Sequence, residues 1–233
     1  MNIYFLLEGK STEKKIYESW LKYLLPELTK VQHYYQANYN NYCLVSANGY
    51  PSIIHDYIPD AIEKIKETDK YNYLVICIDA EEETAVSKKQ EIENFISQKD
   101  LRLKLGKVKL ISIIQNRCIE TWLLGNRKMF HSRQPLEKSL SDYAKYYDVS
   151  VKDPELMGNY SQDYNHAQFH CSYLKEIFKA KKISYTKKNP GEAKNKSYLD
   201  ELTKRFRLEP EHLQTFQDFI EFCQMIKKEL SFE

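Results

Sequence analysis

The chain has 233 residues, of which 42% are hydrophobic and 29% charged, and its formal net charge at pH 7 is +2. This length suits one well-packed domain, alone or with an appendage, and the composition excludes an intrinsically disordered chain. No apolar stretch approaches the roughly 20 residues of a membrane helix, and the start MNIYFLLEGK is too quickly charged for a signal peptide. We therefore expect a soluble protein that stays in the cytoplasm, with no membrane partner.

The cysteines support the same compartment. They are widely spaced, odd in number and without a CxxC pair: Cys43, Cys77, Cys118, Cys171 and Cys223. This spacing favours reduced thiols over a disulfide framework or a structural zinc site.

Short apolar segments alternate with segments of helical spacing along the first half of the chain. Strands are expected at residues 2–7, 42–46, 73–78 and 108–114. Helices are expected at residues 13–25, 52–66 and 84–97, and a further helix begins at residue 119. This alternation predicts an α/β fold with a mainly parallel sheet flanked by helices.

The pattern changes to polar, tyrosine-rich helical segments in the second half. We therefore expect two parts, an α/β domain at residues 1–127 and a helical C-terminal region at residues 128–233. Within the second part, residues 175–207 carry eleven basic and four acidic side chains, whereas residues 1–174 are nearly neutral. Such a basic band is typical of a surface that binds a polyanion, and a solvated helical surface is the alternative.

Acidic residues stand at the ends of three predicted strands. Glu8 ends the first strand, Asp79 and Glu81 follow the third, and Glu120 lies just beyond the fourth. The carboxyl ends of parallel strands share one edge of a sheet, where carboxylates repel one another unless a cation lies between them. Mg²⁺ or Mn²⁺ with oxygen ligands suits this place and supports phosphoryl chemistry. Each acid alone has a structural alternative, such as a favourable position at a helix N-terminus.

These segments resemble a known family. YFLLEGKSTEKKIY followed by LVICIDAEEE resembles the Toprim domain of topoisomerases, primases and OLD-family nucleases. QNRCIETWLL resembles the FExWL element of small Toprim proteins from bacterial defence loci, the RloB-like and related groups. The resemblance covers about residues 1–125 and implies a Toprim, Rossmann-like sheet.

The resemblance also implies roles for individual residues. Glu8 matches the catalytic Glu, a metal ligand or general base, Asp79 and Glu81 take the two DxD positions, and Glu120 matches the third acidic position. Glu13 resembles the additional metal-binding Glu of the EGxxxE turn. The chain departs from the family in having Glu rather than Asp at position 81 and a spacing of five positions from Glu8 to Glu13, where many relatives have four.

Four further residues are candidate nucleic-acid contacts. Arg117 precedes Glu120 and could contact a phosphate, with an ordinary surface cation as the alternative. The turn at residues 185–191 contains Lys187 and Lys188 beside Tyr185. Such a turn could follow a nucleic-acid backbone, with the tyrosine stacked on a base, or it could be an exposed loop.

Together these features predict a divalent-metal-dependent endonuclease that hydrolyses phosphodiesters of DNA or RNA. The resemblance implies an effector of bacterial anti-phage defence with a separately encoded ATPase as partner. The alternative is a non-catalytic binding or regulatory subunit on a Toprim scaffold, acting in a complex with that ATPase. The sequence leaves the oligomeric state open.

Overall fold

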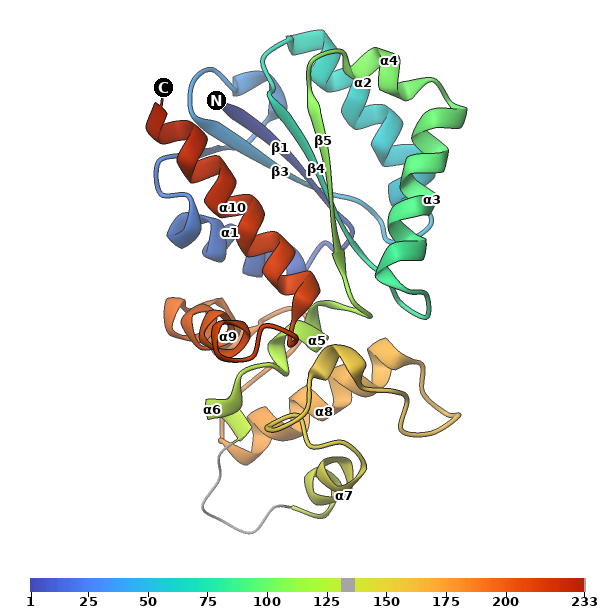
Figure 1. Ribbon diagram of the computed structural model, residues 1–233, viewed down its shortest axis with the longest axis vertical. Helices are drawn as coiled ribbons and strands as arrows, with labels where there is room; N and C mark the ends of the chain where they lie inside the picture. Colours follow the sequence, from blue (N-terminus) through green and yellow to red (C-terminus); the bar gives the residue numbers. More distant parts are fainter. Residues whose placement is uncertain (131–136, 233) are drawn as a thin grey trace.

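The computed structural model describes residues 1–130 and 137–232 and has an α/β fold (Figure 1). Its sheet has the strand order β2-β3-β1-β4-β5, and every neighbouring pair is parallel. The strands are β1 (Asn2–Leu7), β2 (Thr29–Val31), β3 (Asn41–Ser46), β4 (Tyr73–Asp79) and β5 (Lys109–Gln115). The predicted α/β fold with a parallel sheet is confirmed, and the three-residue edge strand β2 was not predicted.

Helices cover both faces of the sheet. One face packs against α1 (Thr12–Leu24), α5 (Ile119–Leu123), α9 (Lys196–Leu208) and α10 (Gln214–Phe232). The other face packs against α2 (Ile58–Thr68), α3 (Ala85–Gln98) and α4 (Leu101–Leu105). Figure 1 shows α1 and α10 on one side of the strands and α2 to α4 on the other.

The central strand β1 explains this layering. Successive side chains of a strand point to opposite faces, and all six residues of β1 are buried. Ile3 and Phe5 enter the core under α1 and α10, whereas Tyr4 and Leu6 enter the core under α2. A strand that is apolar on both faces must be covered on both, and this requirement fixes the three-layer arrangement.

The C-terminal part is helical, as predicted. Beyond α5 lie α6 (Arg127–Phe130), α7 (Lys138–Tyr146) and α8 (His166–Ala180), which Figure 1 places past the carboxyl ends of the strands. Short 3₁₀ segments lie at Tyr34–Gln36, Pro154–Leu156 and Gly191–Lys194, and a π-helical turn at Ile53–Tyr57 leads into α2.

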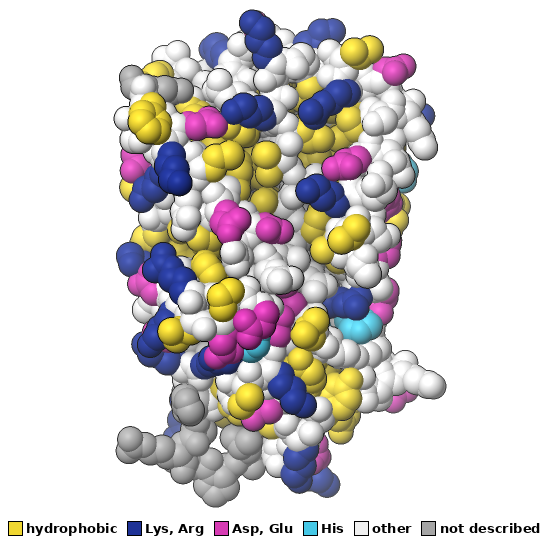
Figure 2. Space-filling model, viewed as in Figure 1, with side chains coloured by type: hydrophobic (Ala, Val, Ile, Leu, Met, Phe, Trp, Pro, Cys, Tyr) yellow, Lys and Arg dark blue, Asp and Glu magenta, His cyan; other side chains and the backbone are white. Residues whose placement is uncertain are grey.

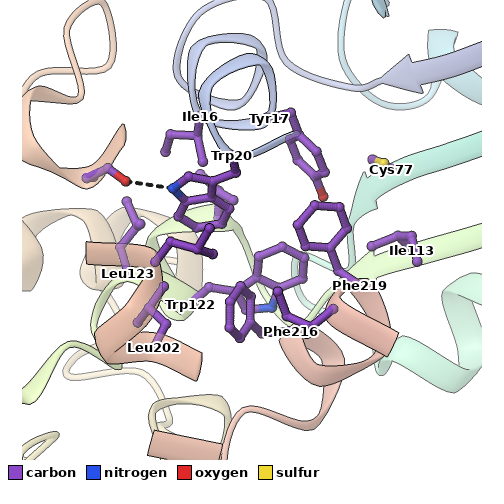
Figure 3. Close-up of a cluster of buried hydrophobic side chains, with 14 of the residues drawn as sticks. Ile16, Tyr17, Trp20, Cys77, Ile113, Trp122, Leu123, Leu202, Phe216 and Phe219 are labelled. Carbon is purple, nitrogen blue, oxygen red and sulfur yellow. Dashed lines mark hydrogen bonds between the residues drawn. The ribbon is translucent and has the colours of Figure 1, made fainter. Parts of the chain in front are cut away.

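An aromatic cluster joins the two halves of the chain (Figure 3). Trp122 lies between Phe216 and Phe219 of α10, with ring centroids 5.4 Å and 6.1 Å away. Trp20 of α1 packs against Phe216 at 5.7 Å, and its indole N–H donates to the carbonyl of Ala193 at 3.0 Å. One hydrophobic core therefore contains side chains from both sides of residue 127, and the two-part division stays a prediction.

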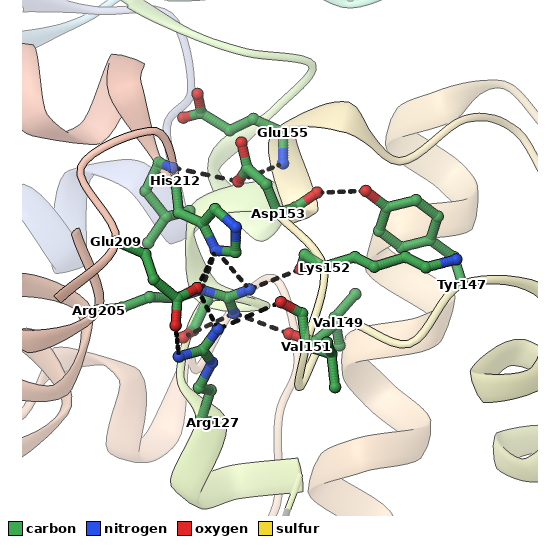
Figure 4. Close-up of polar contacts among 12 residues, drawn as sticks. Arg127, Tyr147, Val149, Val151, Lys152, Asp153, Glu155, Arg205, Glu209 and His212 are labelled. Carbon is green, nitrogen blue, oxygen red and sulfur yellow. Dashed lines mark hydrogen bonds and ion pairs between the residues drawn. The ribbon is translucent and has the colours of Figure 1, made fainter.

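A buried arginine fixes α9 to the segment before α8 (Figure 4). Arg205 is 2% exposed, and its guanidinium donates to the carbonyls of Gly125, Val149 and Lys152. Other cations of the band at residues 175–207 are also engaged, because Lys179 pairs with Glu137 and Lys196 with Asp200. On the face in Figure 2, basic and acidic side chains are interspersed. Part of the positive charge of the band is therefore offset by acidic partners.

All five cysteines are free and buried. Among the described residues, no helix combines the length and the apolar character that crossing a bilayer requires.

Candidate active site

A cavity of about 420 Å³ lies at the carboxyl edge of the sheet. The turn after β1, the loop after β3, the end of β4, the start of α5 and the turn after α8 all contribute to it. Four acidic residues line it together with one basic residue from the C-terminal part: Glu8, Glu13, Asp79, Glu120 and Lys187. The parallel register brings these strand ends together, because Leu7 pairs with Cys77 and Asp79 with Gln115.

Glu8 is held in place by backbone amides. Its Oε2 accepts from the N–H of Asp79 at 3.0 Å, and its Oε1 accepts from the N–H of Tyr50 at 3.1 Å. The side chain is buried, and this burial raises the pKa of its carboxyl, whereas the two amide hydrogen bonds act in the opposite direction. The carboxylate is therefore oriented by main-chain atoms from two other strand ends.

Glu13, in the first turn of α1, folds back onto the turn after β1. Its Oε2 accepts from the N–H of Gly9, and its Oε1 accepts from the side-chain amide of Gln115 at 2.7 Å. Burial, followed by repulsion from Glu8, raises the pKa of Glu13 to about 8. A side chain at position 9 would overlap this carboxylate, so the close approach requires glycine.

Asp79, the last residue of β4, has a carboxylate oxygen without a partner. Its Oδ1 is buried and accepts no hydrogen bond from the described residues. Burial, followed by repulsion from Glu13 and Glu8, raises the pKa of Asp79 well above its ordinary value. A buried acceptor among other carboxylates is expensive unless a proton or a cation satisfies it.

Glu120 is joined to the turn at residues 185–191. The hydroxyl of Tyr185 donates to Glu120 Oε1 at 2.9 Å. Lys187 also lines the cavity, and the charge of Glu120 is the largest cause of its raised pKa. The hydroxyl of Thr12, at the start of α1, donates to the Lys187 carbonyl at 2.7 Å. The turn is thereby fixed over the acidic residues.

These contacts give Tyr185 a structural role. The side chain is only 7% exposed, and its ring lies 5.2 Å from that of Phe178. Stacking on a nucleic-acid base stays a prediction that this geometry does not favour, because the ring belongs to the core and the hydroxyl donates to Glu120. Lys187 does lie in the cavity, whereas Lys188 is exposed beside it and its carbonyl accepts from the ammonium of Lys15.

Arg117 and Glu81 are not among the residues that line the cavity. The guanidinium of Arg117 donates to the carbonyls of Glu81 and Glu83 at 3.1 Å and 2.9 Å. Arg117 therefore holds the loop after β4, and its contact with a phosphate stays a prediction that this geometry does not favour. Glu81 is exposed on that loop, so its role as a metal ligand is likewise not favoured.

The acidic residues match a hard cation in chemistry but are not drawn together around one point. In the ranges that the structure describes, no group of three His, Cys, Asp or Glu side chains has the spacing of a metal site. The cavity nevertheless holds four carboxylates, whose oxygens Mg²⁺ and Mn²⁺ prefer, and Asp79 Oδ1 has no hydrogen-bond partner among the described residues. These residues fit such an ion if their carboxylates move closer together when it binds.

Two residues near the cavity, Gln115 and Lys88, belong to no motif that could be recognised in the sequence. Gln115 is fully buried at the end of β5 and orients Glu13. Lys88 is 1% exposed, pairs with Glu83 and Glu91, and lies 3.9 Å above the ring of Tyr50. Gln115 reaches Glu13 and Lys88 reaches Tyr50 across long stretches of sequence, so only the fold reveals these two contacts.

Comparison with protein-family models, with curated proteins and with solved structures gave no match.

Proposed function

We propose that this protein is a divalent-metal-dependent nuclease that hydrolyses phosphodiester bonds of DNA or RNA. The observation that carries the proposal is the position of Glu8, Glu13, Asp79 and Glu120 around one cavity, with Lys187 beside them. Burial raises the pKa of Asp79, and its acidic neighbours raise it further. A bound divalent cation would remove this unfavourable repulsion.

In the proposed site, Glu8, Asp79 and Glu120 hold Mg²⁺ or Mn²⁺, with Glu13 behind them. When bound, such an ion neutralises phosphate oxygens and lowers the pKa of a coordinated water. The protein keeps Glu8 oriented through two backbone amides, and the hydroxyl of Tyr185 orients Glu120 through Oε1. The ammonium of Lys187 would bind a phosphate oxygen of the substrate.

The order of the acids along the chain supports kinship with Toprim proteins. Glu8 follows β1, Asp79 ends β4, and Glu120 lies in α5 directly after β5. The resemblance to Toprim proteins of bacterial defence loci extends the proposal to an anti-phage effector that works with a separately encoded ATPase. This extension rests on family analogy.

A second candidate function is a non-catalytic binding or regulatory subunit. Two observations favour it. The carboxylates of Glu8 and Glu13 already accept hydrogen bonds from within the chain, and the described residues contain no preformed set of three metal ligands. In that case the acidic cavity would be stabilised by protonation rather than by a metal.

The test is cleavage of plasmid DNA, single-stranded DNA and total tRNA in Mg²⁺, Mn²⁺ or EDTA. Glu8→Gln and Asp79→Asn keep side-chain shape, and Glu93→Gln, an exposed acid on α3, is the matched control. We expect metal-dependent cleavage that falls at least about 100-fold in both site variants and is unchanged in the control.

Calorimetric titration with Mn²⁺ separates the two functions. Binding that is lost in Asp79→Asn, together with an inactive wild type, would indicate a nuclease that requires its partner. A wild type that neither cleaves nor binds Mn²⁺ would refute the metal-dependent nuclease and leave the regulatory subunit.

A further inference from the structure

A second recess shares Lys187 with the acidic cavity. It has a volume of about 560 Å³ and is formed by the beginning of α8, the segment before it and the turn after it. We call it the α8 recess and define it by six of its lining residues: Tyr164, Gln168, Cys171, Ser172, Lys175 and Lys187. Helix α8 lies past the carboxyl ends of the strands in Figure 1, on the same end of the molecule as the acidic cavity.

The two cavities share a wall. Lys187 lines both of them. Cys171 also lines the α8 recess. The pKa of the Cys171 thiol is raised to about 11, first by burial and second by the negative charge of Glu120. Glu120 lines the acidic cavity, so its effect on Cys171 is a second sign that the two cavities lie next to each other.

The chemistry of the α8 recess suits a phosphate backbone. Lys175 is exposed and has no ion pair among the described residues, unlike Lys179 one turn further along α8. The Oε1 of Gln168 accepts from the Asn165 N–H, so the amide NH₂ is the group left for a ligand. The recess is lined by two lysines, Lys175 and Lys187, and one acidic residue, Asp163. Its formal charge is therefore positive.

We propose that the α8 recess binds the nucleotides next to the scissile phosphate of a single-stranded nucleic acid. The inference rests on the proposed nuclease function and names its substrate class. Lys187 and Lys175 would bind successive phosphates, and Tyr164, which is half-buried in the wall, supplies an aromatic surface for a base. The face of an unpaired base is free to stack on an aromatic ring, whereas in a duplex neighbouring bases cover it, so this aromatic surface favours a single strand.

The experiment measures binding separately from cleavage. Fluorescence anisotropy in EDTA would use a labelled 12-nucleotide single strand, as DNA and as RNA, and the matching duplex. The test variant is Lys175→Glu. The control is Lys228→Glu, an exposed lysine near the end of α10, which Figure 1 places at the opposite end of the molecule. Both changes are on the surface, so neither should prevent folding.

We expect the wild type to bind the single strand more tightly than the duplex. Lys175→Glu should weaken single-strand binding about tenfold more than the control does. It should also reduce the slope of log affinity against log salt by about 0.7, the value for one lost phosphate contact.

Three results overturn the inference: no single-strand binding by the wild type, equal or tighter binding of the duplex, and equal losses in the two variants. If the protein cleaves nucleic acid and Lys175→Glu binds like the control, the recess is refuted and the nuclease stands. If binding depends on Lys175 but no cleavage occurs with Mg²⁺ or Mn²⁺, the nuclease fails and the recess stands as a single-strand binding site.

Discussion

Replacement of Gly9 by alanine is the most direct test of how the acidic cavity is built. The nearest atoms to a Cβ at this position all belong to Glu13: it would overlap Oε2 and lie 3.1 Å from Cδ and 3.4 Å from Cγ. The backbone at residue 9 has no positive φ, so alanine is not strained by its own conformation. The only cost of the methyl group is therefore the displacement of the Glu13 carboxylate.

The expected size of that cost follows from the contacts that are lost. Displacement breaks the hydrogen bond from the Gly9 N–H to Glu13 and disturbs the one from Gln115. A hydrogen bond to a charged or buried carboxyl contributes about 1.5–3 kcal/mol. We expect Gly9→Ala to lower the free energy of unfolding by about 2–3 kcal/mol, which lowers the melting temperature by about 4–12 °C in a chain of this length.

Urea denaturation of four proteins measures the effect as a double-mutant cycle: wild type, Gly9→Ala, Glu13→Ala and the double variant. Without the Glu13 side chain the three nearest atoms to the methyl group are gone, so alanine at position 9 should be neutral or stabilising by up to about 1 kcal/mol. The coupling energy should then be about 2–3 kcal/mol. An equal cost in both backgrounds would show that Glu13 does not rest on Gly9, and the geometry described for the cavity would be wrong.

Two further predictions concern other buried acids. Tyr185→Phe keeps the ring but removes the donor to Glu120, and it should destabilise the protein by about 1–3 kcal/mol in urea denaturation; an unchanged midpoint would show that this hydrogen bond does not form. Burial raises the pKa of Glu155 from 4.5 to about 7, so the native state holds this proton more tightly than the unfolded chain does. Its contribution to stability is complete below about pH 4.5 and is lost as the pH rises to about 7. In Glu155→Gln, the fall in unfolding free energy between pH 5 and pH 8 should therefore be smaller than in wild type by about 2–3 kcal/mol, and an identical fall would contradict the assignment.

The sequence predicts the strands and the acids at their ends, because these depend on the local pattern of apolar and polar residues. The apolar runs at β1 and β4 identify strands buried on both faces, because they are short, rich in branched and aromatic residues, and bounded by polar or turn residues. The positions of Glu8 and Asp79 follow from the same pattern, because parallel strands end at one edge of the sheet. Their place in a shared cavity therefore follows from the order of strands and acids along the chain.

The remaining features depend on contacts between distant parts of the chain. Tyr185 sits in a turn that looks basic and exposed, and only packing against Phe178 and Glu120 makes it a core residue. Arg205 belongs to a basic segment by sequence, yet three carbonyls surround its guanidinium. Charge and turn propensity are properties of the segment itself. Burial depends on which other parts of the chain pack against that segment.

The hydrogen bond from Thr12 to the Lys187 carbonyl spans 175 residues of sequence, and it affects when the cavity can form. A ribosome produces the chain from its N-terminus, so the strands that carry Glu8 and Asp79 can pair before residue 187 has been made. The cavity receives Lys187 and Tyr185, the donor to Glu120, only after most of the chain has been made. Any activity of this site is therefore a property of the finished protein rather than of its nascent α/β half.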